Sequence, residues 1–387
     1  MHISLGKPQF YWRMTDAPNV PPNPVPDFVD FEFSFLEECQ LIIQTRNAQT
    51  WRYLETVYRE NYNVGYLQEG HALADSYGND FIQCITDAIA RHRPATRRVS
   101  EIGAGGCWVL KQLRDRGYEV AAIDPSPVAI RKGKELGIEV IPEFYPAGRD
   151  IPRSDVVIHY DVLEHVTDPV AFLRHHRRDL HPGGLLIAAV PDCTPYIERG
   201  DISMILHEHL NYYDHESLAN VASAAGFEVL EVVKGGYGGV LYCVARAGAE
   251  EQPWQPRSGI GKFSRWGEGV QRLRTEVDAF LDEGMRDGHT LGCYVPLRAT
   301  PYLALRGFTR GLRFFDDDPG IHHRYFDGFP IAVENMADLI ARPVTHLLIL
   351  SFAFGDKIRS RINAGLPGHS MAIRCLSDFD VHKHARA

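Results

Sequence analysis

The sequence lacks the features that mark secreted, membrane-embedded or disulfide-stabilised proteins. Its N-terminal stretch has no apolar segment of the kind that a signal peptide needs, and no apolar run is long enough to span a bilayer. The seven cysteines are scattered and include no Cys-x-x-Cys pair, so we expect reduced thiols rather than a disulfide framework or a zinc knuckle. These absences predict a cytoplasmic protein with no membrane partner.

Positive charge is also scarce relative to negative charge. The chain has 41 Lys and Arg residues against 50 Asp and Glu residues, which gives a formal net charge of −9. Because binding to a polyanion favours a basic surface, we expect no nucleic-acid partner. With 387 residues, of which 44% are hydrophobic, the chain can form packed cores and is too long for one ordinary domain.

Hydrophobic periodicity divides the chain into four consecutive segments. Residues 1–76 are irregular and predict an N-terminal module that covers the substrate or acts as a lid. Residues 77–248 alternate strand and helix patterns and end in a hairpin pattern, which predicts a mainly parallel sheet covered by helices on both faces. Residues 249–286 indicate a linker followed by a long amphipathic helix. Alternation resumes over residues 287–387 and predicts a second, smaller α/β domain.

A glycine-containing turn follows the first strand of the 77–248 segment. The sequence Glu101-Ile-Gly103-Ala104-Gly105 lies directly after that strand and before a helix pattern. Glycines permit a tight turn and close approach of a ligand, and the N–H groups at a helix start receive polar or anionic groups. Many α/β turns contain such glycines for packing reasons alone, so the turn needs support from other residues.

Asp124 provides the first support, because it stands at the end of the next strand, 23 residues after Glu101. A carboxylate at that position accepts hydrogen bonds from ribose hydroxyls in dinucleotide-binding folds. It can also cap the next helix, because Pro125 and Ser126 follow it. Both roles are compatible.

Two later segments make the pattern more specific. Tyr160-Asp-Val-Leu-Glu-His165 closes the fourth strand pattern, and His181-Pro-Gly-Gly precedes the fifth. Together with the glycine turn and Asp124, their order and spacing over about residues 77–247 resemble class I S-adenosylmethionine-dependent methyltransferases. The resemblance implies a Rossmann-like sheet and S-adenosyl-L-methionine as cofactor.

The resemblance also implies roles for individual residues. Glu101 and the Gly103–Gly105 backbone, which includes Ala104, would hold the amino-acid part of the cofactor, and Asp124 would hold its ribose. The remaining cofactor contacts would come from Pro125 and Ser126 beside the adenine, Glu143 or Phe144 on its other side, and His159 and Tyr160 at the sulfonium end. His165 would stabilise a turn.

The most polar stretch after strand five is His207-Glu208-His209-Leu-Asn-Tyr212-Tyr213. Class I methyltransferases place acceptor-site residues in this region. The two histidines flank Glu208, but a His-Glu-x-x-His motif is absent and the sequence shows no third ligand. We therefore expect no metal in this block.

This block resembles the Tyr-His-Glu-His-x-x-Tyr segment of sugar C-methyltransferases in deoxysugar biosynthesis, where a residue of the segment serves as the base. A histidine with an ordinary pKa near ~6.5 can remove a proton at neutral pH. We expect His209 to be the base and Glu208, His207, Tyr212 and Tyr213 to shape the acceptor pocket. His207, Tyr212 and Tyr237 remain alternatives for the base.

The chain also departs from those C-methyltransferases. Their N-terminal module binds zinc through cysteines, whereas this chain has only Cys39 there, so we expect no zinc. Leu206 stands in place of their tyrosine, and Tyr237 in place of a histidine.

Three functional hypotheses follow, each for a monomer or a homodimer. The first is C-methylation of a nucleotide sugar or related natural-product intermediate, and the second is O- or N-methylation of a sugar-like or other secondary metabolite. The third is a non-catalytic cofactor-binding scaffold. The joint presence of Glu101, Asp124 and His209 argues against the scaffold.

Overall fold

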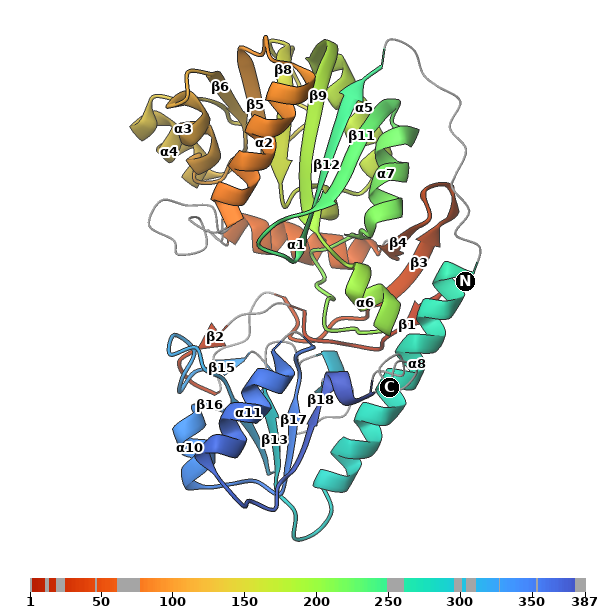
Figure 1. Ribbon diagram of the computed structural model, residues 1–387, viewed down its shortest axis with the longest axis vertical. Helices are drawn as coiled ribbons and strands as arrows, with labels where there is room; N and C mark the ends of the chain where they lie inside the picture. Colours follow the sequence, from red (N-terminus) through yellow and green to blue (C-terminus); the bar gives the residue numbers. More distant parts are fainter. Residues whose placement is uncertain are drawn as a thin grey trace. The chain divides into compact units, whose positions relative to one another are not determined.

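A computed structural model describes residues 2–10, 14–18, 25–45, 47–60, 77–248, 261–295, 301–303, 311–326, 328–352 and 354–379. The chain forms two compact units, each assembled from segments that are far apart in the sequence. Unit 1 comprises Met1–Phe33, Pro195–His207 and Gly261–Ala387, and unit 2 comprises Ser34–Thr194 and Glu208–Ile260. Figure 1 labels the elements along the chain.

Unit 2 is built on a seven-stranded sheet in the order β11-β12-β9-β8-β5-β6-β7. The strands from β9 to β7 are parallel, whereas β12 is antiparallel to both of its neighbours. The bounds are β5 Arg98–Ile102, β6 Glu119–Ile123, β7 Glu139–Ile141, β8 Ser154–Tyr160, β9 Leu180–Pro191, β11 Phe227–Lys234 and β12 Val240–Ala247. This sheet confirms the predicted Rossmann-like α/β architecture.

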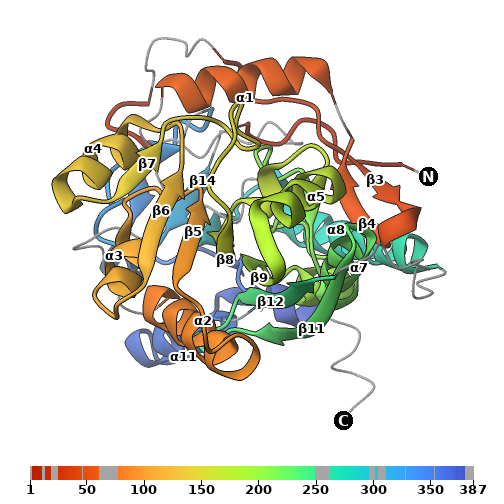
Figure 2. The same ribbon diagram turned by 90° about the horizontal axis from the view of Figure 1, so that it is seen from above.

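Helices cover both faces of this sheet (Figure 2). One core gathers Phe81 and Ile85 of α2 and Trp108 of α3 against the sheet, and a second gathers Phe172 of α5 and Leu218 of α7 on the other face. The helix bounds in unit 2 are α1 Ala48–Glu60, α2 Asn79–His92, α3 Trp108–Arg114, α4 Pro127–Leu136, α5 Pro169–Asp179 and α7 His215–Ala224. The face that each strand residue presents therefore decides which helix layer it meets.

Short elements complete unit 2 near the end of β8. They are η1 Glu37–Cys39, β4 Leu41–Gln44, η3 Leu163–His165 and β10 Asn211–Tyr212. Strand β10 pairs antiparallel with β4, where Tyr212 lies opposite Ile42. Cys39 and Leu41 are buried in the same core as α5 and α7. Part of the predicted N-terminal module thus belongs to the core of unit 2.

Unit 1 contains the second α/β sheet. Its five parallel strands have the order β16-β14-β13-β17-β18. The bounds in unit 1 are β1 Ile3–Ser4, β2 Met14–Thr15, α8 Lys262–Gly284, β13 Leu291–Tyr294, β14 Leu312–Phe315, β15 Tyr325–Phe326, β16 Val333–Glu334, α10 Met336–Ala341, β17 His346–Ile349, α11 Gly355–Gly365, β18 Ala372–Cys375 and η4 Leu376–Phe379; β3 Glu32–Leu36 and α6 Thr194–Arg199 cross the boundary between the units. The expected second α/β domain is confirmed.

The structure divides the chain differently from the four consecutive segments expected from periodicity. Residues 1–33 belong to the same unit as the C-terminal segment, and within that unit Phe33 packs edge-on against Trp266 of α8 with ring centroids 4.6 Å apart. Packing between distant segments, which periodicity does not report, sets this division. The predicted linker at residues 249–260 lies outside the described residues.

Two further observations concern the state of the cysteines and the length and polarity of the helices. All seven cysteines are free thiols, as the scattered spacing predicts. Within the described ranges, every helix is too short or too polar to cross a bilayer.

Candidate active site

The carboxyl ends of the parallel strands in unit 2 carry a row of acidic side chains. Glu101 is the next-to-last residue of β5, Asp124 follows β6, and Asp161 follows β8. Glu101 and Asp124 are buried, with 3% and 5% of their surface exposed. In open α/β sheets, ligands bind outside the carboxyl ends of the strands, so this edge is the candidate site.

Asp124 fixes the glycine turn through two hydrogen bonds. Its Oδ2 accepts the Gly105 N–H at 2.8 Å, and its Oδ1 accepts the Ser126 N–H at 2.7 Å. Gly103 has a φ of 72°, and a Cβ at this position would lie 2.6 Å from Cγ2 of Val162. The turn therefore requires glycine at position 103. Each Asp124 oxygen has a further lone pair that a ribose hydroxyl can use.

Ser126 acts as a helix cap. Its hydroxyl accepts the Ala129 N–H at 3.1 Å at the start of α4, and Pro127 is the first residue of that helix. The sequence offered Asp124 as the cap of this helix, whereas the structure gives that role to Ser126, two residues later. Pro125, next to the cap, is exposed.

Glu101 is a buried carboxylate without a complete set of hydrogen bonds. Its Oε2 has no hydrogen-bond partner among the described residues. Burial, reinforced by the nearby charge of Asp124, raises the pKa of Glu101 well above its usual range. A cationic group placed beside it would stabilise the ionised form. Glu101 therefore suits the α-amino group of an amino-acid ligand.

Glu101→Gln tests this electrostatic reading. Because the folded-state pKa is raised, stability that the protein has at low pH is lost as pH rises through that pKa. Glutamine does not ionise, so between about pH 5 and about pH 8 the melting temperature of the cofactor-free variant should rise relative to that of the wild type. Affinity for S-adenosylhomocysteine should fall in the same variant. Melting curves whose difference does not change with pH would contradict the reading.

The two residues expected beside the adenine differ in their availability. The Glu143 carboxylate accepts the Gly148 N–H at 2.8 Å and pairs with Arg149 Nε at 3.1 Å, so contacts within its own loop occupy it. The Phe144 ring is 77% exposed. Phe144 is thus the better candidate for a contact with an aromatic base.

The structure corrects the expectation that His159 faces the cofactor. The His159 ring is fully buried against Phe172 and His176 of α5, with ring centroids 6.0 and 5.5 Å away. Burial lowers its pKa well below the usual range. Consecutive strand residues point to opposite faces, so the neighbouring Tyr160 turns instead to α2, where its ring lies 5.2 Å from that of Phe81.

His207 is corrected as well. It belongs to unit 1, where it is 2% exposed and its ring lies 5.0 Å from those of Phe10 and Phe31. Its Nε2 lies 3.0 Å from the Val29 carbonyl oxygen, and burial lowers its pKa to about 4. Such a histidine is a neutral core residue. His209 lies in unit 2.

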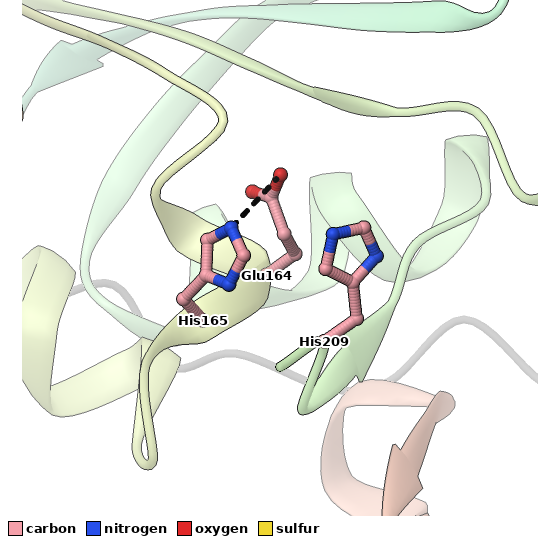
Figure 3. Close-up of side chains that lie close together, drawn as sticks. All are labelled: Glu164, His165 and His209. Carbon is pink, nitrogen blue, oxygen red and sulfur yellow. Dashed lines mark ion pairs between the residues drawn. The ribbon is translucent and has the colours of Figure 1, made fainter. Parts of the chain in front are cut away.

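Around His209 the structure assembles a group that the sequence analysis missed. Figure 3 shows His209 facing Glu164 and His165 of η3, the short helix that follows β8. The ring centroids of His165 and His209 are 4.9 Å apart, and His165 Nε2 lies 3.8 Å from Glu164 Oε1. One ligand atom from each residue lies within 4.8 Å of the others. We call these three residues the Glu-His-His cluster.

Backbone and amide hydrogen bonds hold the two halves of the cluster together. The Leu210 N–H donates to the Glu164 carbonyl at 2.7 Å. The Asn211 side-chain amide donates to the carbonyls of Leu163 at 3.1 Å and Val166 at 2.7 Å. These bonds tie the segment that bears His209 to η3. The sequence showed no third ligand for the histidine block, and the structure places Glu164 and His165 beside His209.

Glu164 is the most constrained member of the cluster. It is 1% exposed, and neither of its carboxylate oxygens has a hydrogen-bond partner among the described residues. Burial raises its pKa well above the usual range, and the nearby carboxylates of Asp161 and Glu208 raise it further. A buried carboxylate in this setting is stable only when it is protonated or faces a cation.

The other residues proposed for the acceptor pocket take different positions. Tyr212 is fully buried, with its ring 6.4 Å from that of His209. Glu208 directs its backbone carbonyl to His165, with 2.8 Å between the oxygen and Nδ1. Tyr237 is 53% exposed and packs against Tyr77. Of the candidates for the base, only His209 belongs to the Glu-His-His cluster.

Asp161 is a second residue that sequence reasoning missed. It adopts a left-handed backbone conformation with a φ of 53°, and burial raises its pKa to about 7. Non-glycine residues in this conformation occur often at functional sites. The signal was present in the sequence, where Asp161, Glu164 and His165 directly follow an apolar strand.

Known proteins resemble this chain mainly over unit 2. Residues 75–232 match a family model described as a methyltransferase domain. A C-methyltransferase from Streptomyces niveus, NovU, is 26% identical over 241 residues, which cover 57% of either chain. A ubiquinone biosynthesis O-methyltransferase from Xanthomonas axonopodis pv. citri is 27% identical over 187 residues, which cover 44% of this chain and 72% of that protein.

Two solved structures that align with part of this chain are named methyltransferases. The Burkholderia thailandensis 1,6-didemethyltoxoflavin-N1-methyltransferase has a TM-score of 0.40 and 16% identity, and it overlaps 56% of this chain and 99% of its own. The N-methyltransferase NodS from Bradyrhizobium japonicum has a TM-score of 0.38 and 15% identity, with 52% and 99% covered. Residues 75–232 thus match a methyltransferase-domain family, and unit 2 around them has the sheet of a Rossmann-like fold with an antiparallel edge.

Proposed function

We propose that the protein transfers the methyl group of S-adenosyl-L-methionine to a small-molecule acceptor. One observation carries this proposal: Glu101 and Asp124 stand at the ends of adjacent strands, on either side of the glycine turn. Such a pair can bind the charged amino-acid part and the ribose of the cofactor at the two ends of one turn. Phe144, with its exposed ring, is the proposed adenine contact.

The acceptor end of the proposed site lies beyond β8. Strand β8 is the neighbour of β5, and η3 with Glu164 and His165 follows β8 directly. We place the acceptor beside the Glu-His-His cluster. We propose that His209 is the residue responsible for removing the acceptor proton. A histidine beside a carboxylate is suited to this step at neutral pH.

Methyl transfer from a sulfonium is an in-line displacement. The acceptor atom supplies the electron pair of the new bond to the methyl carbon, and the bond from sulfur to that carbon breaks. Its electron pair stays on sulfur, which becomes the neutral thioether of S-adenosylhomocysteine. A carbon or hydroxyl acceptor must also lose a proton, and the site must hold the acceptor close to the methyl group.

The proposed acceptor is a nucleotide sugar or a related natural-product intermediate, methylated at carbon. Support comes from the relative NovU, which is named a C-methyltransferase. A second candidate is O-methylation, because several similar proteins are named ubiquinone biosynthesis O-methyltransferases. The alignment with NovU spans little more than half of either chain. The identity of the acceptor is therefore our proposal and is not transferred from NovU.

A panel of nucleotide sugars and hydroxylated small molecules, incubated with cofactor carrying a ¹³C-labelled methyl group, distinguishes the two candidates. We expect a labelled product from a nucleotide sugar, with the methyl signal in the chemical-shift range of a methyl bonded to carbon. A signal typical of a methoxy group would replace C-methylation by O-methylation. Absence of transfer to every compound, in a protein that binds S-adenosylhomocysteine, would count against the sugar-like acceptor class.

A further inference from the structure

We propose that Glu164, His165 and His209 bind a divalent transition-metal ion at the acceptor end of the site. The inference deepens the proposed function, because it assigns to the cation the role of binding an acceptor oxygen. The site itself rests on the geometry of the Glu-His-His cluster, which is independent of the identity of the acceptor.

The donor set and its spacing suit such an ion. Two imidazole nitrogens and one carboxylate oxygen lie within 4.8 Å of one another. Metal–ligand bonds of about 2.0–2.2 Å place neighbouring donors of a tetrahedral ion roughly 3.4 Å apart, so side-chain rotations that bring the donors about 1 Å closer would close the site. Mixed imidazole and carboxylate ligands favour zinc, manganese, iron or cobalt over calcium or magnesium.

His165 already has the orientation of a metal ligand. Its Nδ1 lies 2.8 Å from the Glu208 carbonyl oxygen, and a carbonyl oxygen can only accept a hydrogen bond. The neutral ring therefore carries its proton on Nδ1 and its lone pair on Nε2, which faces Glu164 in Figure 3. Metal-binding histidines commonly donate their second N–H to a backbone carbonyl in this way.

The alternative is a direct ion pair, and the distances favour it less. His165 Nε2 and Glu164 Oε1 are 3.8 Å apart, which is longer than the roughly 2.7–3.2 Å of an N–H···O hydrogen bond. Both oxygens of the buried Glu164 are also without a hydrogen-bond partner among the described residues. An ion held between the three donors satisfies the carboxylate and both rings at once. The acidic neighbours Asp161 and Glu208 add to the attraction for a cation.

Three protein ligands leave coordination positions for an acceptor. A cation in such a site lowers the pKa of a bound hydroxyl group, and it stabilises the enolate formed when a carbon next to a carbonyl loses its proton. With His209 as a ligand of the cation, its ring acts through the cation and not as the base: the proton leaves to water, and the acceptor keeps the electron pair that attacks the methyl group. We therefore expect acceptors that carry a hydroxyl or carbonyl oxygen next to or at the methylated atom.

Cobalt(II) provides the test, because its visible absorption reports its ligands. The full-length protein is dialysed against a chelator and titrated with CoCl₂. We expect one equivalent to bind with a visible spectrum typical of nitrogen and oxygen ligands. Glu164→Gln, His165→Asn and His209→Asn should each weaken binding more than about 100-fold, since changes to residues that merely orient ligands already cost 10- to 100-fold. His181→Asn, at an exposed histidine of unit 2, is the matched control and should bind cobalt like the wild type.

Binding of S-adenosylhomocysteine by calorimetry, measured on every variant, shows that unit 2 is folded. No equivalent of cobalt in a wild type that binds S-adenosylhomocysteine would overturn the proposal, and so would cobalt binding that the three substitutions leave unchanged. Methyl transfer that persists at full rate in metal-free protein would refute the assigned role of the cation. A cobalt site in a protein that transfers no methyl group to any acceptor would support the site while contradicting the proposed function.

Discussion

His209→Asn is expected to lower turnover by about 10²–10⁴-fold while leaving the affinity for S-adenosylhomocysteine nearly unchanged. The physical reason is position: His209 lies beside Glu164 and His165 beyond the end of β8, whereas Glu101 and Asp124, the proposed cofactor contacts, lie at the ends of β5 and β6. Proton transfer to the imidazole and coordination of a cation are alternative roles of His209, and either role requires its ring. Asparagine keeps a polar side chain of similar length and removes both functions.

The measurement is single-turnover methyl transfer once an acceptor is known, together with calorimetry of S-adenosylhomocysteine binding. His181→Asn controls for the loss of a histidine elsewhere in unit 2, and Tyr237→Phe tests another residue considered as the base. A His209→Asn enzyme with near-normal turnover would show that the proton is lost at another group. If Tyr237→Phe is the defective variant instead, the acceptor lies on the side of α2, whose Asp80 contacts the Tyr237 backbone N–H.

Asp124→Ala is expected to weaken S-adenosylhomocysteine binding by about 10- to 150-fold for each charge-assisted hydrogen bond lost, equivalent to about 1.5–3 kcal/mol per bond. The carboxylate accepts hydrogen bonds from the N–H groups of Gly105 and Ser126, so its removal should affect both the proposed ribose contact and the turn that is proposed to hold the amino-acid part. Calorimetry on the purified variant measures the loss directly.

Ser126→Ala separates the two roles of this region. Its hydroxyl caps α4, so the substitution should lower the free energy of unfolding by about 1 kcal/mol and change ligand affinity little. The outcome that sinks the ribose assignment is an Asp124→Ala protein with unchanged affinity. In that case Asp124 serves the glycine turn alone, and the ribose binds elsewhere along the sheet edge.

The sheet of unit 2 could be predicted because its determinants are local. These determinants are apolar strand patterns such as 155–160, glycines that end strands, and helix caps such as Asp168 and Ser126. Each of them affects the structure of residues only a few positions away. The glycine turn could be located for the same reason. A spacing of 23 residues placed Asp124 on the adjacent strand, where it binds Gly105.

The acceptor end could not be predicted, because it depends on contacts across the chain. Leu210 and Glu164 meet through a backbone hydrogen bond although 46 positions separate them, and no local pattern encodes that meeting. His207 and His209 stand two residues apart, yet they belong to different units. The expectation for His159 was wrong for a different reason. The alternation of side chains along the strand can be predicted from the sequence, but which face of the sheet packs against α5 cannot.

The close approach of Gly103 to Val162 has a consequence for the variability of the site. A methyl group on residue 103 would collide with the Val162 side chain, one residue before η3 and two before Glu164. Any side chain at position 103, in the loop that is proposed to hold the methyl donor, therefore pushes on the segment that leads into η3, whose Glu164 and His165 are proposed to receive the acceptor. Substitutions in η3 that aim to change acceptor specificity must therefore leave the space beside Gly103, which has no side chain, unchanged.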